Sequence, residues 1–192
     1  MAEPLPLFGE STPLVPPLYQ SSVYCLPDLD ALDRIMDGEE PGFIYARDSH
    51  PNAQRLGQQL AELEAGDWAL VCGSGMAAIS VPLLGLVQQG DRIVASNRLY
   101  GRTTALLTEE LPRFGVKTSL VDSCDLDQVR QALREPCKVL FVETMSNPLL
   151  RLVDIEELAQ LAGEHEVVLI VDNTFATPVL VQPLELDRKS VV

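Results

Sequence analysis

Four short polar turns follow apolar segments of this 192-residue chain and hold the residue types from which a binding site can be built. They occupy residues 73–76 (GSGM), 97–101 (NRLYG), 144–148 (TMSNP) and 172–174 (DNT). Asp172 is notable because it directly follows the apolar run 167–171 (VVLIV). A carboxylate at the end of a buried segment is costly to desolvate and normally has a partner. The sequence therefore predicts a partner of opposite charge for Asp172.

The glycine-rich turn predicts a phosphate site. Gly73, Gly75 and Ala78 satisfy the pattern G-x-G-x-x-A of dinucleotide-binding proteins. The same geometry serves any phosphate, because glycine lets the backbone approach closely and the first N–H groups of the following helix point outward. A dinucleotide site also needs an acid at the end of the next strand, whereas that strand ends in Ser96 and Asp91 precedes it. An NAD(P)-binding oxidoreductase of the Rossmann type is therefore the less favoured alternative.

A phosphate at Gly75 and Met76, an aromatic ring at Tyr100 and a carboxylate at Asp172 together fit a flat phosphorylated heterocycle with a basic nitrogen. Pyridoxal 5'-phosphate (PLP) has these properties. Its pyridinium nitrogen would give Asp172 the opposite charge, and the carboxylate would keep that nitrogen protonated, which makes the ring a better electron sink.

These turns need a scaffold in which strands end at one edge, and the pattern from Pro51 onward supplies one. Helical segments are expected at 52–66, 76–90, 103–115, 125–136 and 154–165, and strands at 67–72, 92–96, 117–122, 138–144 and 167–171. Such alternation indicates right-handed crossovers and an α/β fold, with a mostly parallel sheet flanked by helices. Ligands of such sheets bind beyond the carboxyl ends of the strands.

Residues 1–50 are predicted to form an extended arm with one short helix, and residues 51–192 an incomplete cofactor-binding domain. Prolines crowd the arm and disfavour regular structure. The short helix is expected within residues 27–38, with Asp28 or Asp30 as its N-cap. The apolar residues of the arm before this helix favour its packing on a second subunit; they are Leu14, Val15, Leu18 and Tyr19.

The formal charge of −14 disfavours nucleic acid and anionic membranes as partners, because both reward clustered Lys and Arg. The four cysteines stand singly, so neither a metal site nor a disulfide framework is predicted; they are Cys25, Cys72, Cys124 and Cys137. No apolar run reaches the length of a membrane helix, and the N-terminus lacks the features of a signal peptide. We therefore expect a cytoplasmic protein.

Six segments follow one another along the chain: TPLVPPLYQSSVY, YARDSHPNAQRL, LAELEAGDWALVCGSGMAAI, LYGRT, VLFVETMSNPLLRLVDI and VVLIVDNTFATPVLVQPLEL. In this order they resemble the Cys/Met metabolism family of PLP-dependent enzymes, which includes cystathionine γ-synthase, cystathionine γ-lyase, methionine γ-lyase and O-acetylhomoserine sulfhydrylase. The resemblance implies the large domain of a fold-type I PLP-dependent transferase. It also implies a trans-sulfuration lyase or transferase of methionine and cysteine biosynthesis, which acts on sulfur amino acids or activated homoserine as a homotetramer.

The resemblance also implies roles for single residues. Tyr45 and Arg47 would reach across a dimer interface to the phosphate of the neighbouring subunit's cofactor, and an arginine fork suits that task. Gly75 and Met76 would donate backbone N–H groups to the phosphate. Without the resemblance, a surface ion pair is the favoured interpretation of Arg47, because an isolated arginine in a loop is usually solvated. Met76 fits equally well as the first core residue of its helix.

In the same way, the resemblance places Tyr100 on the cofactor ring, as its stacking and catalytic tyrosine. Asn147 would lie near the ring hydroxyl and the substrate carboxylate, Asp172 would pair with the ring nitrogen, and Thr174 would lie beside it. Taken singly, Tyr100 also fits a residue that covers the core, and Asn147 a turn initiator before proline.

The chain departs from the family pattern at two places. The usual Gly-Asn-Pro-Thr after Tyr-x-Arg is replaced by residues 49–52 (SHPN). In the family, a further strand follows the segment PLEL and leads to Ser-x-Thr-Lys, whose lysine forms the Schiff base with the cofactor. That lysine is expected beyond Val192. Lys189 precedes the expected strand and lacks the Ser and Thr neighbours. We therefore expect a chain that is inactive by itself, or a non-catalytic fragment that pairs with full-length subunits.

Overall fold

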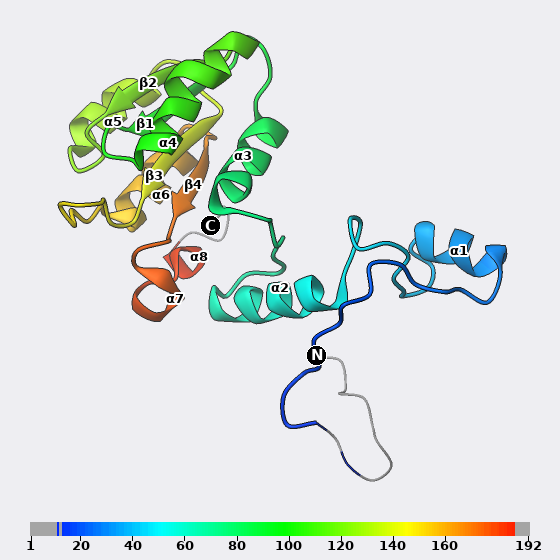
Figure 1. Cartoon of the computed structure of the whole chain (residues 1–192). Helices are drawn as coiled ribbons and strands as arrows, with labels where there is room; N and C mark the ends of the chain where they lie inside the picture. Colours follow the sequence, from blue (N-terminus) through cyan, green and yellow to red (C-terminus); the bar gives the residue numbers. More distant parts are fainter. Residues whose placement is uncertain (1–10, 12, 187–192) are drawn as a thin grey trace. The chain divides into compact units, whose positions relative to one another are not determined.

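The computed structural model describes residue 11 and residues 13–186, and Figure 1 shows its helices and strands. The chain divides into two compact units. The N-terminal unit comprises the residues up to Ala61 together with Trp68–Val71, and the sheet unit comprises Glu62–Asp67 and the residues from Cys72 onward. No helix among the described residues is long and apolar enough to cross a membrane.

The N-terminal unit is mainly extended chain around two helices, α1 (Leu29–Met36) and α2 (Pro51–Leu63). The predicted short helix is confirmed as α1, and its N-cap is Asp28, whose carboxylate accepts from the Ala31 N–H at 2.8 Å. Two segments on either side of α1 meet at the antiparallel bridge Val23–Tyr45. The side chain of Asn52 binds the backbone of Tyr19 through two hydrogen bonds. The Tyr19 N–H donates to Asn52 Oδ1 at 3.1 Å, and Asn52 Nδ2 donates to the Tyr19 carbonyl at 2.9 Å.

The sheet unit is built on four parallel strands in the order β2-β1-β3-β4, which confirms the predicted α/β fold. The strands are β1 (Arg92–Ser96), β2 (Lys117–Val121), β3 (Val139–Glu143) and β4 (Val168–Asp172). All four end at the same edge because they are parallel. In the β3–β4 register, Glu143 lies opposite Asp172 at that edge.

Helices cover both faces of the sheet (Figure 1). One face packs against α3 (Gly75–Leu86), α4 (Gly101–Ala105) and the two turns that continue α4, η1 (Leu106–Glu110) and η2 (Leu111–Phe114). The other face packs against α5 (Leu126–Leu133) and α6 (Ile155–Glu164). After β4 come two single-turn helices, α7 (Thr177–Leu180) and α8 (Pro183–Leu186).

Alternate residues of the strands feed two separate cores, as the period of a strand requires. The first core contains Val94, Leu140, Val142, Leu169 and Val171 with Leu133 and Leu158 of the helices. The second contains Ile93, Ala95, Val139, Phe141 and Ile170 with Leu83, Leu107 and Leu111. Each fully buried large apolar side chain contributes about 1.5–3 kcal/mol of transfer free energy, so these two layers fix where the strands end.

The predicted strand at 67–72 is wrong: this segment is irregular in the structure. Its apolar side chains are largely solvent-exposed, with Trp68 at 77% and Leu70 at 62%. No described strand forms a ladder with it. A strand is stabilised by pairing, so a strand-like sequence without a neighbouring strand stays irregular.

The helix predicted at 103–115 is replaced by three helix types in succession. An α-helical turn from Gly101 passes into a π-helical turn and then a 3₁₀ turn, which ends at Gly115 with φ of 79°. Pro112 lies in the last turn and has no N–H for an α-helical hydrogen bond, which explains the change of helix type there.

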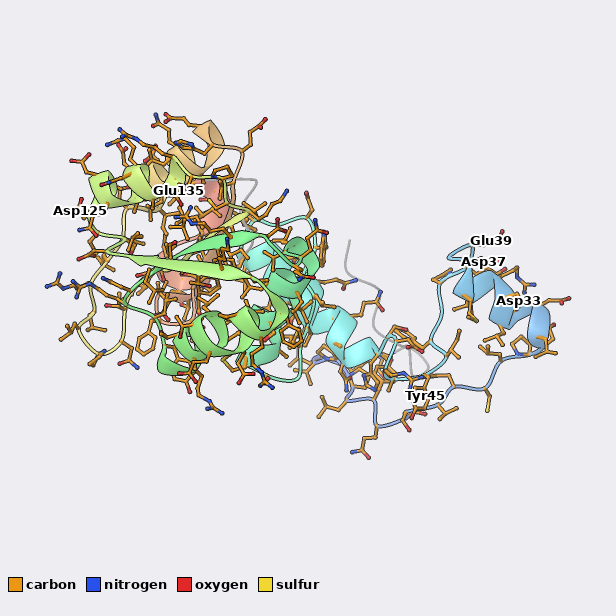
Figure 2. The ribbon with its side chains drawn as sticks, turned by 90° about the horizontal axis from the view of Figure 1, so that it is seen from above. Asp33, Asp37, Glu39, Tyr45, Asp125 and Glu135 are labelled. Atoms are coloured by element: carbon orange, nitrogen blue, oxygen red, sulfur yellow. The ribbon has the colours of Figure 1, made fainter. Side chains whose placement is uncertain are left out.

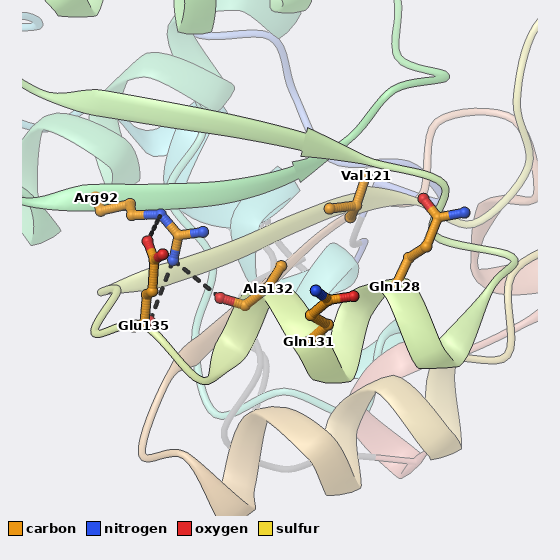
Figure 3. A pocket seen from close by; sticks show the side chains of 6 residues that line it. All are labelled: Arg92, Val121, Gln128, Gln131, Ala132 and Glu135. Carbon is orange, nitrogen blue, oxygen red and sulfur yellow. Dashed lines mark hydrogen bonds and ion pairs between the residues drawn. The ribbon is translucent and has the colours of Figure 1, made fainter.

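Arg92 ties α5 to the sheet beside a pocket of about 310 Å³ (Figure 3). Its guanidinium donates to the Ser119 hydroxyl at 3.0 Å and to the carbonyls of Ala132 and Glu135 at 3.0 and 3.1 Å. These carbonyls lie at the C-terminal end of α5, where helix carbonyls lack intrahelical partners. Arg92 therefore acts as a cap that fixes this helix on β1 and β2.

Candidate cofactor site

Two carboxylates lie side by side at the carboxyl edge of the sheet. Glu143 ends β3, Asp172 ends β4, and the two are paired in register. The Thr144 N–H donates to the Asp172 carbonyl at 3.1 Å and keeps the strand ends together. Glu143 is only 7% exposed. The edge is therefore strongly acidic at the place where open parallel sheets bind ligands.

Asp172 has a backbone partner but no cationic one in the described part of the chain. Its Oδ1 accepts from the Thr174 N–H at 3.0 Å, which sets the turn after β4. None of the ion pairs found among residues 13–186 involves Asp172 or Glu143. The partner of opposite charge that Asp172 requires is thus not supplied by these residues, and a ligand with a cationic atom fits the site.

Glu143 connects this acidic edge to Tyr100. Its Oε1 accepts from the backbone N–H of Tyr100 at 2.5 Å. Burial raises the pKa of Glu143, the Tyr100 N–H lowers it, and the neighbouring Asp172 carboxylate raises it. Tyr100 is 53% exposed and lies directly before α4, which begins at Gly101. A buried carboxyl group thus fixes the backbone of a half-exposed tyrosine at this edge of the sheet.

The glycine-rich turn forms the start of α3, as the sequence predicts. Ser74 is the N-cap, and its hydroxyl accepts from the Ala77 N–H at 3.1 Å. The first backbone bond of the helix runs from Ala78 N–H to Ser74 C=O at 3.0 Å, so the N–H groups of Gly75 and Met76 precede it. A Cβ built on Gly75 would meet no atom within 4 Å, which leaves room for a ligand.

Packing directs this helix start to the acidic edge. Leu83 of α3 is buried with Ile93 of β1, and only residues 87–91 connect the two elements. The helix must therefore run antiparallel to the strand, with its N-terminus at the strands' carboxyl ends, and Figure 1 shows this orientation. An anion at Gly75 and a cation at Asp172 are thus both accommodated at one edge of the sheet.

The remaining predicted residues of the sheet unit lie in loops at the same edge. Thr174 is exposed two residues after Asp172, and Asn147 is exposed in the loop after β3. That loop is held by two bonds of Ser146, whose N–H donates to the Arg151 carbonyl at 3.0 Å and whose carbonyl accepts from Leu150 N–H at 2.8 Å. The topology therefore gathers all six predicted residues of this unit at one edge: Gly75, Met76, Tyr100, Asn147, Asp172 and Thr174.

Tyr45 and Arg47 belong to the N-terminal unit, where Figure 2 labels Tyr45. The Arg47 guanidinium lies 5.0 Å from the centre of the Tyr45 ring, in a cation–π contact. It also forms an ion pair with Asp48 at 3.5 Å, and the Arg47 side chain is 78% exposed. An exposed arginine of this kind has capacity for an additional anion.

Sequence reasoning missed Glu143 as a functional residue. The signal was present, because Glu143 ends an apolar strand just as Asp172 does. The ion pair of Arg98 with Asp122 at 2.8 Å, at the ends of β1 and β2, was also missed. Their spacing of 24 residues carries no pattern, and only the parallel pairing of the two strands brings them together.

Comparison with known proteins agrees with this geometry. The profile of the family described as Cys/Met metabolism PLP-dependent enzyme matches residues 9–192. The chain belongs to this family. The resemblance inferred from the sequence motifs is thereby confirmed, and the dinucleotide-binding alternative is not favoured.

Relatives of known activity share a third or more of their residues with the chain. An L-methionine gamma-lyase of Porphyromonas gingivalis is 41% identical over 180 residues, which are 93% of this chain and 45% of that protein. A cystathionine gamma-lyase of Bacillus subtilis is 36% identical over 176 residues, 92% of this chain and 44% of that protein. The chain thus spans a little under half the length of the curated relatives it matches.

A solved structure confirms the fold and the predicted cofactor. A protein named as an O-acetylhomoserine (thiol)-lyase from Campylobacter jejuni superposes with a TM-score of 0.83 and 38% identity, over 91% of this chain and 43% of that one. It contains N'-pyridoxyl-lysine-5'-monophosphate. PLP is the cofactor of the family, and the fold is that of the fold-type I enzymes. Lys189, which the sequence analysis compares with the Schiff-base lysine of the family, lies outside the described residues.

Proposed function

We propose that this chain forms the cofactor-binding part of a PLP-dependent enzyme that acts on sulfur amino acids or activated homoserine. The reaction class is β- or γ-elimination, or γ-replacement, of the cystathionine γ-synthase and γ-lyase type. The observation that carries the proposal is the acidic pair of Glu143 and Asp172, which has no cation among the described residues and shares its edge with the N-terminus of α3. The relatives named as lyases of methionine and cystathionine support the substrate class.

Different residues of the sheet unit would bind different parts of the cofactor. The N–H groups of Gly75 and Met76 would bind the phosphate at the positive end of α3. Asp172 would hold a proton on the ring nitrogen, and Thr174 would keep that carboxylate in place through its N–H. PLP, when bound, supplies the electron sink that stabilises negative charge on the substrate carbon.

Tyr100 and Asn147 would act on the ring and the substrate. The half-exposed Tyr100 ring offers a stacking face, and Glu143 fixes the backbone from which it projects. The exposed Asn147 amide can donate to the ring hydroxyl and to the substrate carboxylate. Both residues would orient reactants and shield them from water.

We further propose a homo-oligomer, a dimer or tetramer, in which Tyr45 and Arg47 contribute to a neighbouring subunit's cofactor site. The arm presents apolar side chains to solvent, with Leu14 at 99% and Leu18 at 84% exposure, which favours burial in an interface. A cytoplasmic location is part of the proposal, since Cys25 and Cys124 are free, exposed thiols that suit a reducing compartment.

Titration of the purified chain with PLP tests the cofactor site directly. Binding is followed by the absorbance of the cofactor after equilibrium dialysis, with pyridoxal as the control that lacks the phosphate. We expect saturable binding of PLP and much weaker binding of pyridoxal. Absence of saturable PLP binding, or tighter binding of NADPH in a parallel fluorescence titration, would contradict the proposal.

Pairing of subunits is tested separately. The chain is mixed with a full-length relative carrying a purification tag, and size-exclusion chromatography then shows whether the two elute together. A variant with Leu14 and Leu18 changed to serine removes the exposed apolar groups of the arm and is the matched control. We expect co-elution with the original chain and its loss with the variant. Equal elution behaviour of both proteins would contradict the role of the arm.

A further inference from the structure

The side chain of Asn173 ties the turn after β4 to two distant segments. It lies between Asp172 and Thr174 in sequence and is only 7% exposed. Its Nδ2 donates to Glu64 Oε1 at 3.2 Å and to the Val181 carbonyl at 3.0 Å. Glu64 belongs to the turn that follows α2, 109 residues earlier in the chain. One amide therefore joins that turn, the end of β4 and the segment after α7.

This contact leaves two buried oxygen atoms without hydrogen-bond partners in the described part of the chain. They are Asn173 Oδ1 and Glu64 Oε2. Both atoms are acceptors when Glu64 is ionised, so neither can satisfy the other. A protonated Glu64 has an O–H donor that can be directed at Asn173 Oδ1. The planar acid and the planar amide would then share two hydrogen bonds, and both oxygen atoms would be satisfied.

We propose that Glu64 acts in its protonated form as a positioning residue, which pairs with the Asn173 amide through two hydrogen bonds and so fixes the turn that holds Asp172.

The charges around the pair favour the protonated form. Glu62 and Asp67 flank Glu64 in its own segment, Asp172 lies on β4 and Glu185 on α8. All of these groups are carboxyls, and residues 62–67 and 167–186 contain no Lys, Arg or His. Burial raises the pKa of Glu64, while donation from the Asn173 amide lowers it. Ionised Glu64 would thus have no counter-charge on the segments that meet there.

The pair bears on the cofactor site through the backbone. Asn173 is anchored by its side chain, and the next residue, Thr174, donates its N–H to Asp172 Oδ1 at 3.0 Å. Gln182 adds a second link between the same segments by donating to the Leu63 carbonyl. Loss of the acid–amide pair would free the turn and with it the orientation of the Asp172 carboxylate. This last step rests on the proposed function, whereas the pair itself does not need the cofactor.

The test uses the variant Glu64→Gln in the 192-residue chain without cofactor. Glutamine reproduces the protonated form, because its carbonyl can accept from Asn173 Nδ2 and its amide can donate to Asn173 Oδ1. Glu62→Gln removes the same charge from an exposed neighbour and is the matched control. Melting temperatures are compared from about pH 5 to about pH 8, and the titration of the glutamate carboxyl groups is followed by carbon-13 NMR.

Because its pKa is raised by folding, the stabilisation from Glu64 should be present at low pH and lost as the pH rises through that raised value. We expect Glu64→Gln to melt at or above the original chain near pH 8, and the difference to vanish on acidification. The signal that is missing in this variant should be one that titrates above the usual range of a glutamate. A lower melting temperature for Glu64→Gln at every pH, or titration of Glu64 within or below the usual range of a glutamate, would overturn the proposal.

The variant Asn173→Asp is the reciprocal test. It places a carboxylate opposite Glu64 and should lower the melting temperature by about 5 °C at neutral pH, and addition of Glu64→Gln should restore most of this loss. No restoration would contradict the pairing. PLP titration of the same variants distinguishes the two proposals. If the original chain binds no PLP, the proposed function fails; if it binds and Asn173→Asp binds equally well, only the link to Asp172 fails.

Discussion

Glu143 Oε1 accepts the backbone N–H of Tyr100 at 2.5 Å, so a carboxyl group at the end of β3 fixes the loop that follows β1. The same carboxyl lies opposite Asp172 in the β3–β4 register. One buried acid thus contacts the segment that carries the aromatic ring and adjoins the carboxylate that needs a cation. The position of the ring and the charge of the site are therefore linked through Glu143.

The first prediction concerns this link. Glu143→Ala leaves the Tyr100 N–H without its acceptor, so the free energy of unfolding should fall by about 1–2 kcal/mol. Urea denaturation followed by circular dichroism measures the change. Glu109→Ala removes a glutamate from an exposed position and should have little effect.

Glu143→Gln sharpens the same experiment. Its carbonyl can still accept from Tyr100, while the like-charge contact with Asp172 disappears. Because folding raises the pKa of Glu143, the original chain should lose stability as the pH rises through that value, and the Gln variant should not. An equal loss of stability in the Ala and Gln variants would show that the hydrogen bond to Tyr100 is unimportant.

A second prediction addresses the charge of Asp172. Asp172→Asn keeps an acceptor for the Thr174 N–H but removes the negative charge that would hold the pyridinium nitrogen. The affinity for PLP should fall by about tenfold or more, since loss of one partly buried ion pair costs about 1.4 kcal/mol. Equilibrium dialysis measures this, with Asp67→Asn as the exposed control. Unchanged affinity would remove Asp172 from the cofactor site.

The parallel sheet and the composition of its carboxyl edge could be predicted from the sequence, because apolar runs of strand length alternate with amphipathic segments. Asp172, Tyr100 and Gly75 were found for the same reason, because each lies at the end or the start of a regular element. The segment 67–72 has an equally strand-like composition and is irregular. Its state depends on a neighbouring strand, and pairing between distant segments is not encoded in local pattern.

Contacts between distant segments account for what the sequence could not show. The Asn173–Glu64 pair spans 109 residues and the Tyr100–Glu143 bond spans 43, and neither has a sequence pattern. The change from α-helical to π-helical and then 3₁₀ geometry after Ala105 likewise leaves no trace in the spacing of apolar residues. Only Pro112, in the 3₁₀ turn, indicates where α-helical hydrogen bonding is interrupted.

A third prediction follows from the Arg98–Asp122 ion pair. The Arg98 guanidinium, together with the Cys124 backbone N–H, holds the pKa of Asp122 below its usual range. A lowered folded-state pKa means that this stabilisation is present above the usual aspartate pKa and is lost as the pH falls through the lowered value. In Arg98→Ala, carbon-13 NMR should show the pKa of Asp122 rising, and Arg113→Ala, which breaks an exposed ion pair with Glu110, should leave it unchanged. An unaltered titration of Asp122 in Arg98→Ala would contradict this assignment.

The last prediction concerns the end of α6, where Glu166 adopts a left-handed backbone with φ of 57°. The Val167 N–H donates to the Ala162 carbonyl at 2.9 Å and the Glu166 N–H to the Gly163 carbonyl at 3.3 Å, which is the Schellman pattern in which glycine is preferred at this position. Glu166→Gly relieves the strain of a side chain at positive φ and removes a negative charge from the negative end of the helix.

We expect this substitution to raise the free energy of unfolding by about 0.5–1 kcal/mol, as measured by urea denaturation. Glu166→Ala is the matched control, because it removes the charge while keeping the Cβ, and it should give only the smaller electrostatic part of the gain. Equal stabilisation by Ala and Gly would assign the whole effect to charge. Destabilisation by Gly would show that the Glu166 backbone is not strained, because the greater freedom of glycine in the unfolded chain would then outweigh any relief.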